Sequence, residues 1–160
     1  ESSNKIIQQG EIVSFDTDMV GPYGYCADIS RTFVCGNDFN NNQKELYSMS
    51  LEQINHNSNL IKADMSFKEF TEKSWKLPEE YYGNRYSVMV HGIGLCDEWP
   101  SIRYPTDGGD KSGRFLKNMT ITVESYIGKV GGKEGVKLEQ QYLVGENGLE
   151  LMSHHPLEDI

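Results

Sequence analysis

The sequence predicts an α+β domain in which an antiparallel sheet is flanked by helices. Two strand–turn–strand hairpins, within residues 11–34 and 120–144, stand on either side of a segment with helical signals. Strands joined by short turns pair in the antiparallel sense, so we expect antiparallel strands throughout. The chain has 160 residues, of which 37% are hydrophobic, and this is enough for one domain with a core of its own.

The first hairpin begins with residues 11–18, EIVSFDTD, where apolar and polar residues alternate as they do in a strand. GPYG at 21–24 is typical of a turn. Residues 26–34, CADISRTFV, are then expected to form the partner strand.

Two helices are expected next along the chain. The first covers roughly residues 42–61. The second begins at Ser66, which forms a capping box with Glu69 ahead of an apolar run that starts at Phe67.

The rest of the chain returns to strands. YSVMV at 86–90 is a short buried strand, and the prolines and glycines of 99–117 indicate a long loop. Residues 120–128 and 135–144 form the second hairpin around a glycine-rich turn, and 146–153 are expected to add a last strand.

Composition excludes several classes of function. The net charge of −9 leaves no basic stripe for nucleic-acid phosphates, and we attribute the acidic surface to solubility. No apolar run approaches the ~20 residues of a membrane span. The three cysteines, Cys26, Cys35 and Cys96, are odd in number and lack CxxC spacing, which favours free thiols and a cytoplasmic location.

Acidic residues occupy positions inside strands, where carboxylates are disfavoured unless they are paired or bind metal. An acid on one half-exposed strand is ordinarily solvated, but six polar placements over several strands favour a shared site. Asp16 and Asp18 are two residues apart and therefore face the same side of their strand. The full set is Asp16, Asp18, Asp28, His91, Glu124 and Glu139.

Carboxylates gathered in one place repel one another, and divalent metals are the usual compensating cations. Oxygen-rich ligation with one imidazole suits manganese, iron, cobalt or zinc in a two-metal site. A structural zinc site favours thiolates instead, so we do not expect one here.

Four segments carry a resemblance to a known family: DTDMVGPYGYCADISRTF, HGIGL, TVES and LEQQYLV. They resemble the ligand strands of the creatinase, prolidase and methionine aminopeptidase family (M24), which has the pita-bread fold. The resemblance covers residues 10 to about 153 and implies that residues 1–160 form a partial pita-bread catalytic domain whose N-terminal part is missing. It implies two divalent metal ions, with iron favoured over manganese, cobalt and zinc. The implied ligands are Asp16, Asp18, Asp28, His91, Glu124 and Glu139.

The segment HGIGLCDEWP, residues 91–100, departs from the peptidases of this family. Their pattern resembles HGxGLxxHExP, in which a second histidine contacts the substrate, and this chain has no histidine there. Acids on both sides of Thr17 are a second departure. Both departures are similar to the DddP-type dimethylsulfoniopropionate lyase branch, and there the positions of Asp97 and Tyr86 correspond to the base and to a pocket residue.

The resemblance implies an elimination on a small zwitterionic substrate, in which Asp97 removes a proton and dimethyl sulfide and acrylate are released. A partly apolar surrounding, from Leu95, Cys96 and Trp99, would favour such a base. The aromatic faces of Tyr86 and Trp99 are candidates for holding the sulfonium, an attraction worth about 0.5–2 kcal/mol.

Two other functions stay open. One is an M24 metallopeptidase of the Xaa-Pro dipeptidase or aminopeptidase type with an altered loop. The other is a non-catalytic binding module, although such domains usually lose metal ligands. We expect no nucleic-acid or membrane partner, and a homodimer in the full-length protein.

Overall fold

A computed structural model describes residues 4–36, 38–109 and 111–157 of the chain. Its central element is an antiparallel sheet of five strands in the order β6-β5-β7-β8-β9. The strands are β5 (Val88–Gly92), β6 (Ser101–Arg103), β7 (Thr120–Gly128), β8 (Gly135–Val144) and β9 (Leu149–Leu151). The long β7–β8 hairpin lies at the positions that the alternation predicts.

The N-terminal hairpin forms a separate two-stranded ribbon and a small arm. In the ribbon, β1 (Ile12–Asp16) pairs with β4 (Ser30–Val34), and in the arm β2 (Met19–Val20) pairs with β3 (Cys26–Ala27). The predicted strands 11–18 and 26–34 were therefore each too long.

Two features of the backbone account for the break between ribbon and arm. The Thr17 hydroxyl donates to the Ile29 carbonyl at 3.2 Å and accepts from the Ile29 amide at 3.0 Å, which replaces ladder hydrogen bonds at this point. Asp18 has a φ of 29°, outside the extended region that a continuous strand requires.

Three helices precede β5. Helix α1 (Asn41–Leu60) begins one residue earlier than expected, because Asn40 and Gln43 form a reciprocal capping box. Helix α2 (Phe67–Lys73) has the predicted N-cap, with the Ser66 hydroxyl accepting from the Glu69 amide at 3.1 Å. The short α3 (Glu79–Tyr82) was not predicted, nor was β6, which lies inside the expected loop 99–117.

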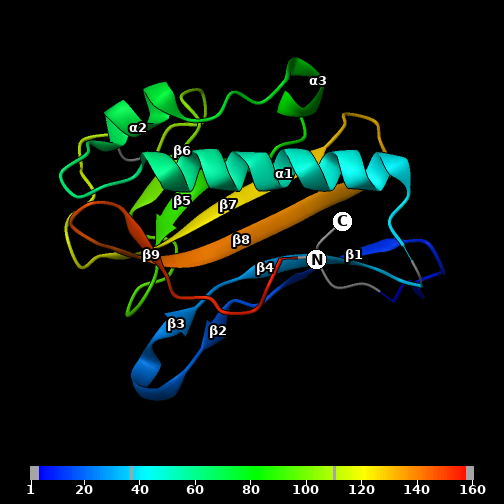
Figure 1. The fold of residues 1–160 in the computed structure, drawn as a ribbon, viewed down its shortest axis with the longest axis horizontal. Coiled ribbons are helices and arrows are strands. Elements are labelled where there is room, and N and C mark those ends of the chain that lie inside the picture. Colours follow the sequence, from blue (N-terminus) through cyan, green and yellow to red (C-terminus); the bar gives the residue numbers. More distant parts are fainter. Residues whose placement is uncertain (1–3, 37, 110, 158–160) are drawn as a thin grey trace.

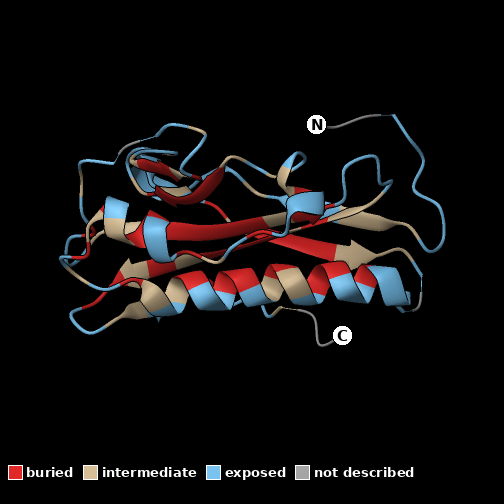
Figure 2. Ribbon diagram, turned by 90° about the horizontal axis from the view of Figure 1, so that it is seen from above, coloured by how far each residue is buried: buried red, intermediate tan, exposed pale blue. Residues whose placement is uncertain are grey.

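The molecule has three layers. Helix α1 covers one face of the sheet over β7 and β8, and the β1–β4 ribbon packs on the other face against β8 (Figure 1). The buried side of α1 faces the strands and its opposite side is exposed (Figure 2). Apolar side chains on the α1 face of β7, such as Ile121, Val123 and Ile127, are buried completely.

The alternating direction of side chains along β7 and β8 determines which face of the sheet carries the polar groups. Because successive residues point to opposite faces, the side chains between those apolar ones point toward the ribbon. The fold thus encloses polar side chains between two β layers. Within the described residues, none of the helices is both long and apolar enough to cross a lipid bilayer.

Candidate functional site

Two glutamates lie at the centre of the space between sheet and ribbon. Glu124 on β7 pairs directly with Glu139 on β8 in the antiparallel register, and each side chain is 1% exposed. Directly opposed like charges on a sheet are destabilising, and burial adds to the cost. Cationic groups must therefore lie close to them.

His91 reaches the same face from β5. It is paired with Thr122, two residues before Glu124, so both side chains are on the ribbon side. Its Nδ1 lies 3.0 Å from the Gly92 carbonyl, which can only accept, so Nδ1 carries the proton and Nε2 faces the carboxylates.

The distances from His91 Nε2 define a compact group. It lies 3.2 Å from Glu139 Oε1, 3.7 Å from Asp28 Oδ2 and 3.8 Å from Glu124 Oε1. Asp28 comes from the link between β3 and β4 and is 3% exposed. This donor set, with an imidazole whose other nitrogen is held by a carbonyl, is typical of a metal site.

Two groups of possible ligands share one carboxylate. Oxygen or nitrogen atoms of Asp28, His91 and Glu139 lie within 4.8 Å of one another, and so do oxygens of Asp18, Asp28 and Asp97. A carboxylate common to both groups is the arrangement that a bridged pair of metal ions requires. Asp16 lies at the edge, where it accepts a 2.6 Å hydrogen bond from Ser30 Oγ.

Unpaired buried oxygens provide an independent test of whether these residues fit a metal. Asp28 Oδ1 and Glu124 Oε1 are buried and have no hydrogen-bond partner within the described part of the chain. Buried polar atoms in native proteins are almost always paired, so both oxygens are available to a cation. The described residues therefore fit divalent metal.

Lys137, which the sequence analysis missed, supplies a protein cation. Its Nζ contacts Glu124 Oε2 and lies 3.3 Å from Glu139 Oε2 and 4.0 Å from Asp16 Oδ2. It precedes Glu139 by two residues and so shares its face, and this period of two was the signal that could have identified it.

Burial and mutual charge shift the titration of this cluster in the protein without metal. Burial is the main cause that raises the pKa of Asp28 and of Glu124 to about 8 each. Burial also works to raise the pKa of Glu139, but its hydrogen bond with His91 and the charge of Lys137 outweigh it and hold the pKa at about 2. Burial works to lower the pKa of His91, whereas Glu139 and Glu124 raise it to about 10.

A cavity of about 460 Å³ opens beside this cluster. Tyr86 is among the residues that line it, and its hydroxyl donates to Glu98 at 3.3 Å. Trp99 is 63% exposed and is not among the residues that line the cavity. The full lining is Ser14, Asp16, Asp18, Asp28, Asn84, Arg85, Tyr86, Glu98, Glu124, Tyr126 and Lys137.

Asp97 is not among the residues that line this cavity, but it is half-buried and has an oxygen within 4.8 Å of oxygens of Asp18 and Asp28, which do line it. Leu95 and Trp99 were expected to surround Asp97 with apolar side chains, but both are mostly exposed to solvent. Glu98 and Tyr126 also line the cavity, and neither was predicted as a pocket residue. The only signal for them in the sequence was that Glu98 follows Asp97 directly and that Tyr126 follows Glu124 by two residues.

Arg31, in the segment ADISRTF, hydrogen-bonds to main-chain carbonyls and not to the carboxylate of a predicted ligand. The Arg31 guanidinium donates to main-chain carbonyls of Ser30 and Glu139, at 2.8 and 2.6 Å, and to those of His155 and Pro156. It therefore holds β4 against β8 and against the C-terminal segment.

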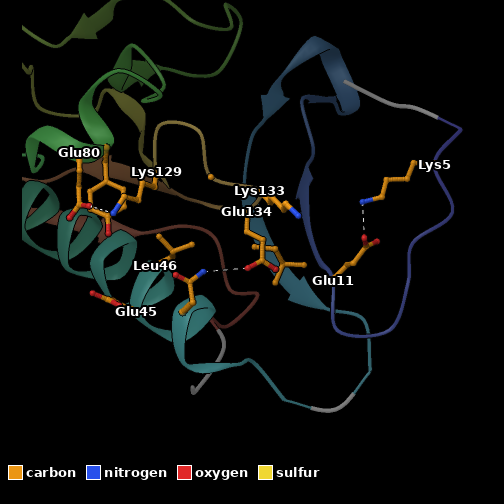
Figure 3. A pocket seen from close by; sticks show the side chains of 12 residues that line it. Lys5, Glu11, Glu45, Leu46, Glu80, Lys129, Lys133 and Glu134 are labelled. Atoms are coloured by element: carbon orange, nitrogen blue, oxygen red, sulfur yellow. Dashed lines mark hydrogen bonds and ion pairs between the residues drawn. The ribbon is translucent and has the colours of Figure 1, made fainter.

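A second cavity, of about 620 Å³, lies elsewhere, beside the first turn of α1 and the turn between β7 and β8 (Figure 3). It contains ion pairs between Lys129 and Glu80 at 2.5 Å and between Lys5 and Glu11 at 2.9 Å. None of the predicted site residues is among those that line it.

Comparison with known proteins agrees with this geometry. Residues 1–146 match the sequence profile of Metallopeptidase family M24. The chain is 38% identical over 162 residues to the dimethylsulfoniopropionate lyase DddP of Roseovarius nubinhibens, a match that covers 99% of this chain and 36% of that protein.

Peptidases are also similar. The Xaa-Pro dipeptidase of Pyrococcus furiosus is 33% identical over 157 residues, covering 95% of this chain and 42% of the dipeptidase. The crystal structure of the prolidase from Pyrococcus horikoshii superposes with a TM-score of 0.80 at 27% identity, over 99% of this chain and 44% of the prolidase. The pita-bread prediction is confirmed, and the chain spans less than half of each of these relatives.

Proposed function

Because the chain belongs to metallopeptidase family M24, we propose that it carries the metal centre of a carbon–sulfur lyase that cleaves dimethylsulfoniopropionate into dimethyl sulfide and acrylate. The observation that carries this proposal is the position of Asp97. Its carboxylate lies within 4.8 Å of possible ligand oxygens of Asp18 and Asp28, where a base would face a substrate held at the centre.

The surroundings of this centre favour a lyase over a peptidase. A peptidase of the predicted pattern uses a second imidazole at the substrate, and no histidine lines the cavity within the described residues. His56 contacts the Lys73 carbonyl on the outer side of α1, and the ring of His155 packs against Phe33. The 38% identity with a dimethylsulfoniopropionate lyase supports the same choice.

The residues that would hold metal are the predicted ligands Asp16, Asp18, Asp28, His91, Glu124 and Glu139. Bound metal supplies Lewis-acid polarisation of a substrate carboxylate, which acidifies the adjacent carbon. Lys137 neutralises part of the carboxylate charge, so that an anionic substrate group can approach.

The elimination itself needs one base and one leaving group. Asp97 accepts the proton from the carbon next to the carboxylate, and the electron pair of that C–H bond becomes the second bond of acrylate. The C–S bond breaks and its electron pair leaves on sulfur as neutral dimethyl sulfide. Water then takes the proton from Asp97. Tyr86, at the cavity wall, faces the substrate with its ring.

The test is headspace dimethyl sulfide from the complete, metal-loaded protein, compared with its Asp97→Asn variant. We expect release by the parent and a 10²–10⁴-fold loss in the variant, the usual contribution of general acid–base catalysis. The metal content of both proteins is measured as well, because Asp97 belongs to one of the two groups of possible ligands, and a loss of metal would assign Asp97 to the ligands instead. A Glu52→Gln variant, altered on the exposed side of α1, serves as the control. A metal-loaded parent that releases no dimethyl sulfide would refute the proposal.

The second candidate is an Xaa-Pro dipeptidase, and the observation that favours it is the 33% identity with the enzyme of Pyrococcus furiosus. Hydrolysis of Xaa-Pro dipeptides by the same preparation distinguishes the two. Dipeptide cleavage without dimethyl sulfide release would assign the chain to the peptidases.

A further inference from the structure

The ammonium of Lys137 occupies a position that a metal ion could take. The side chain is 12% exposed, and its Nζ contacts Glu124 Oε2 and lies 3.3 Å from Glu139 Oε2 and 4.0 Å from Asp16 Oδ2. These oxygens come from β7, β8 and β1, so three strands meet around one cation. All three acids are also predicted metal ligands. The lysine therefore uses oxygens that a metal ion on this side would need.

The backbone of Lys137 is fixed by the β1–β4 ribbon. The Thr32 hydroxyl on β4 donates to the Lys137 carbonyl at 2.8 Å, and the Lys137 amide donates to the same hydroxyl oxygen at 3.0 Å. Lys137 precedes Glu139 by two residues, so both side chains are on the face that the ribbon covers. The position of the ammonium is thus set by the way the ribbon packs on β8.

The opposite side of the two glutamates carries His91 in place of an ammonium. Oε1 of Glu139 and Oε1 of Glu124 lie 3.2 and 3.8 Å from His91 Nε2, and Asp28 Oδ2 lies 3.7 Å from it. Glu124 Oε1 and Asp28 Oδ1 are buried without a hydrogen-bond partner among the described residues. A first metal ion can bind here without disturbing Lys137, because the glutamate oxygens on this side are not those that the ammonium contacts.

Asp16 is a poor metal ligand as long as Lys137 is in place. Its Oδ1 accepts a 2.6 Å hydrogen bond from Ser30 Oγ, and its Oδ2 faces the ammonium. A divalent ion among these oxygens would be repelled by the ammonium at short range, so it can bind only if the ammonium moves. The Tyr86 ring offers the ammonium another partner, since its centre is already 4.8 Å from Nζ.

We propose that Lys137 is an internal cation that competes with metal for the Asp16 side of the centre, so that an ion binds there only by displacing the ammonium toward Tyr86. This role rests on the metal centre of the proposed function, but not on the reaction that the centre catalyses. A residue that merely supports the ligands would strengthen metal binding, whereas a competitor weakens it. Removal of the lysine therefore has opposite consequences for the two roles.

A titration with Mn²⁺ measures the competition. The complete protein is stripped of metal and given one equivalent of Mn²⁺, which we expect on the His91 side, and the affinity for a second equivalent is then measured from free Mn²⁺ by electron paramagnetic resonance. Residues around metal ligands change metal affinity by about 10–100-fold, so we expect Lys137→Met to bind the second ion at least about tenfold more tightly than the parent. Lys137→Arg keeps a cation and should bind it as weakly as the parent.

Further variants separate net charge from position. Lys133→Met removes an exposed lysine from the turn between β7 and β8 and should leave the affinity for the second ion unchanged. Tyr86→Leu removes the ring toward which the ammonium moves and should weaken the second ion about threefold, whereas Tyr86→Phe should not. Circular dichroism of each protein with one equivalent of Mn²⁺ shows whether it is folded.

Unchanged or weaker binding of the second ion in a folded Lys137→Met protein would overturn the competition, and so would a second ion that neither protein binds. If Lys137→Met does not fold with one equivalent, the Tyr86 pair decides, and equal affinities of Tyr86→Leu and Tyr86→Phe for the second ion would overturn the displacement. None of these measurements involves dimethyl sulfide. A protein that releases none can still show the competition, and a lyase can lack it, so the two proposals fail separately.

Discussion

Glu124 and Glu139 face one another directly across the β7–β8 ladder, and both are almost completely buried. Their outer oxygens share the ammonium of Lys137, and their inner oxygens lie 3.8 and 3.2 Å from His91 Nε2. Two like charges in this position require cations on both sides. Lys137 supplies the cation on the outer side. On the inner side the metal-free protein has His91, whose pKa is raised to about 10, and the donors there fit a metal ion.

Replacing Lys137 by methionine is expected to destabilise the protein strongly when metal is absent. The change leaves two buried carboxylates without their cation, and breaking a buried ion pair from one side typically costs about 3–5 kcal/mol. Urea unfolding with a chelator present measures the loss, and added metal should recover part of it. Lys133→Met, an exposed lysine in the adjacent turn, should change stability by less than about 0.5 kcal/mol. Equal effects of the two changes would contradict this role.

The protein without metal is expected to lose stability as the pH rises from about 4.5 to 8. The folded-state pKa of Asp28 and of Glu124 is about 8, above their ordinary values of 3.8 and 4.5, so the folded protein binds more protons over that range. Stability falls with pH wherever the folded state binds more protons. His91, with a pKa of about 10, acts in the same direction above pH 6.5.

Metal reverses this dependence, because it binds deprotonated carboxylates and releases their protons. The increase in melting temperature on adding metal should therefore be larger at pH 7.5 than at pH 5.5. Thermal unfolding at both values, with chelator and with metal, measures it. In Glu124→Gln the decline of the metal-free protein with pH should be shallower. An increase that is the same at both pH values would be inconsistent with protonated ligands.

Ser30 is expected to orient the metal ligands without binding metal itself. Its hydroxyl lies 2.6 Å from Asp16 Oδ1 and 2.9 Å from Glu139 Oε2 and so links the ribbon to β8. Outer partners of ligands typically contribute 10–100-fold to metal affinity or activity, so Ser30→Ala should weaken metal binding by about tenfold. Competition with a chromophoric chelator measures the dissociation constant. Ser48→Ala on the exposed side of α1 should leave it unchanged.

The strands that hold the ligands were predictable because their alternation is regular. Residues 120–128 and 135–144 coincide with β7 and β8, and the Ser66 cap marks the start of α2. The small elements were not predictable. Strand β6 has three residues, and its place at the sheet edge follows from pairing with β5, which no local pattern encodes.

The residues of the site likewise fall into those that could be predicted from the sequence and those that could not. Acids within strands predicted a shared centre, and carboxylate oxygens of Asp28, Glu124 and Glu139 lie 3.7, 3.8 and 3.2 Å from His91 Nε2. Lys137 was not predicted as a site residue because a lysine on a strand is ordinarily solvated. Trp99 was expected in the pocket because it is close to Asp97 in sequence, but the left-handed backbone at Glu98 precedes it and its side chain is largely exposed. Side-chain direction after such a residue cannot be deduced from spacing.

Gly135 is expected to tolerate no side chain as long as Tyr126 is present. The three atoms nearest to a methyl group built there all belong to the Tyr126 side chain: its hydroxyl oxygen, then Cζ at 2.5 Å and Cε2 at 3.0 Å. Gly135→Ala should therefore destabilise the protein by about 1–3 kcal/mol, the usual cost of overpacking. Urea unfolding of the two single variants and of Gly135→Ala with Tyr126→Ala forms a double-mutant cycle, in which the truncated ring should remove most of the cost.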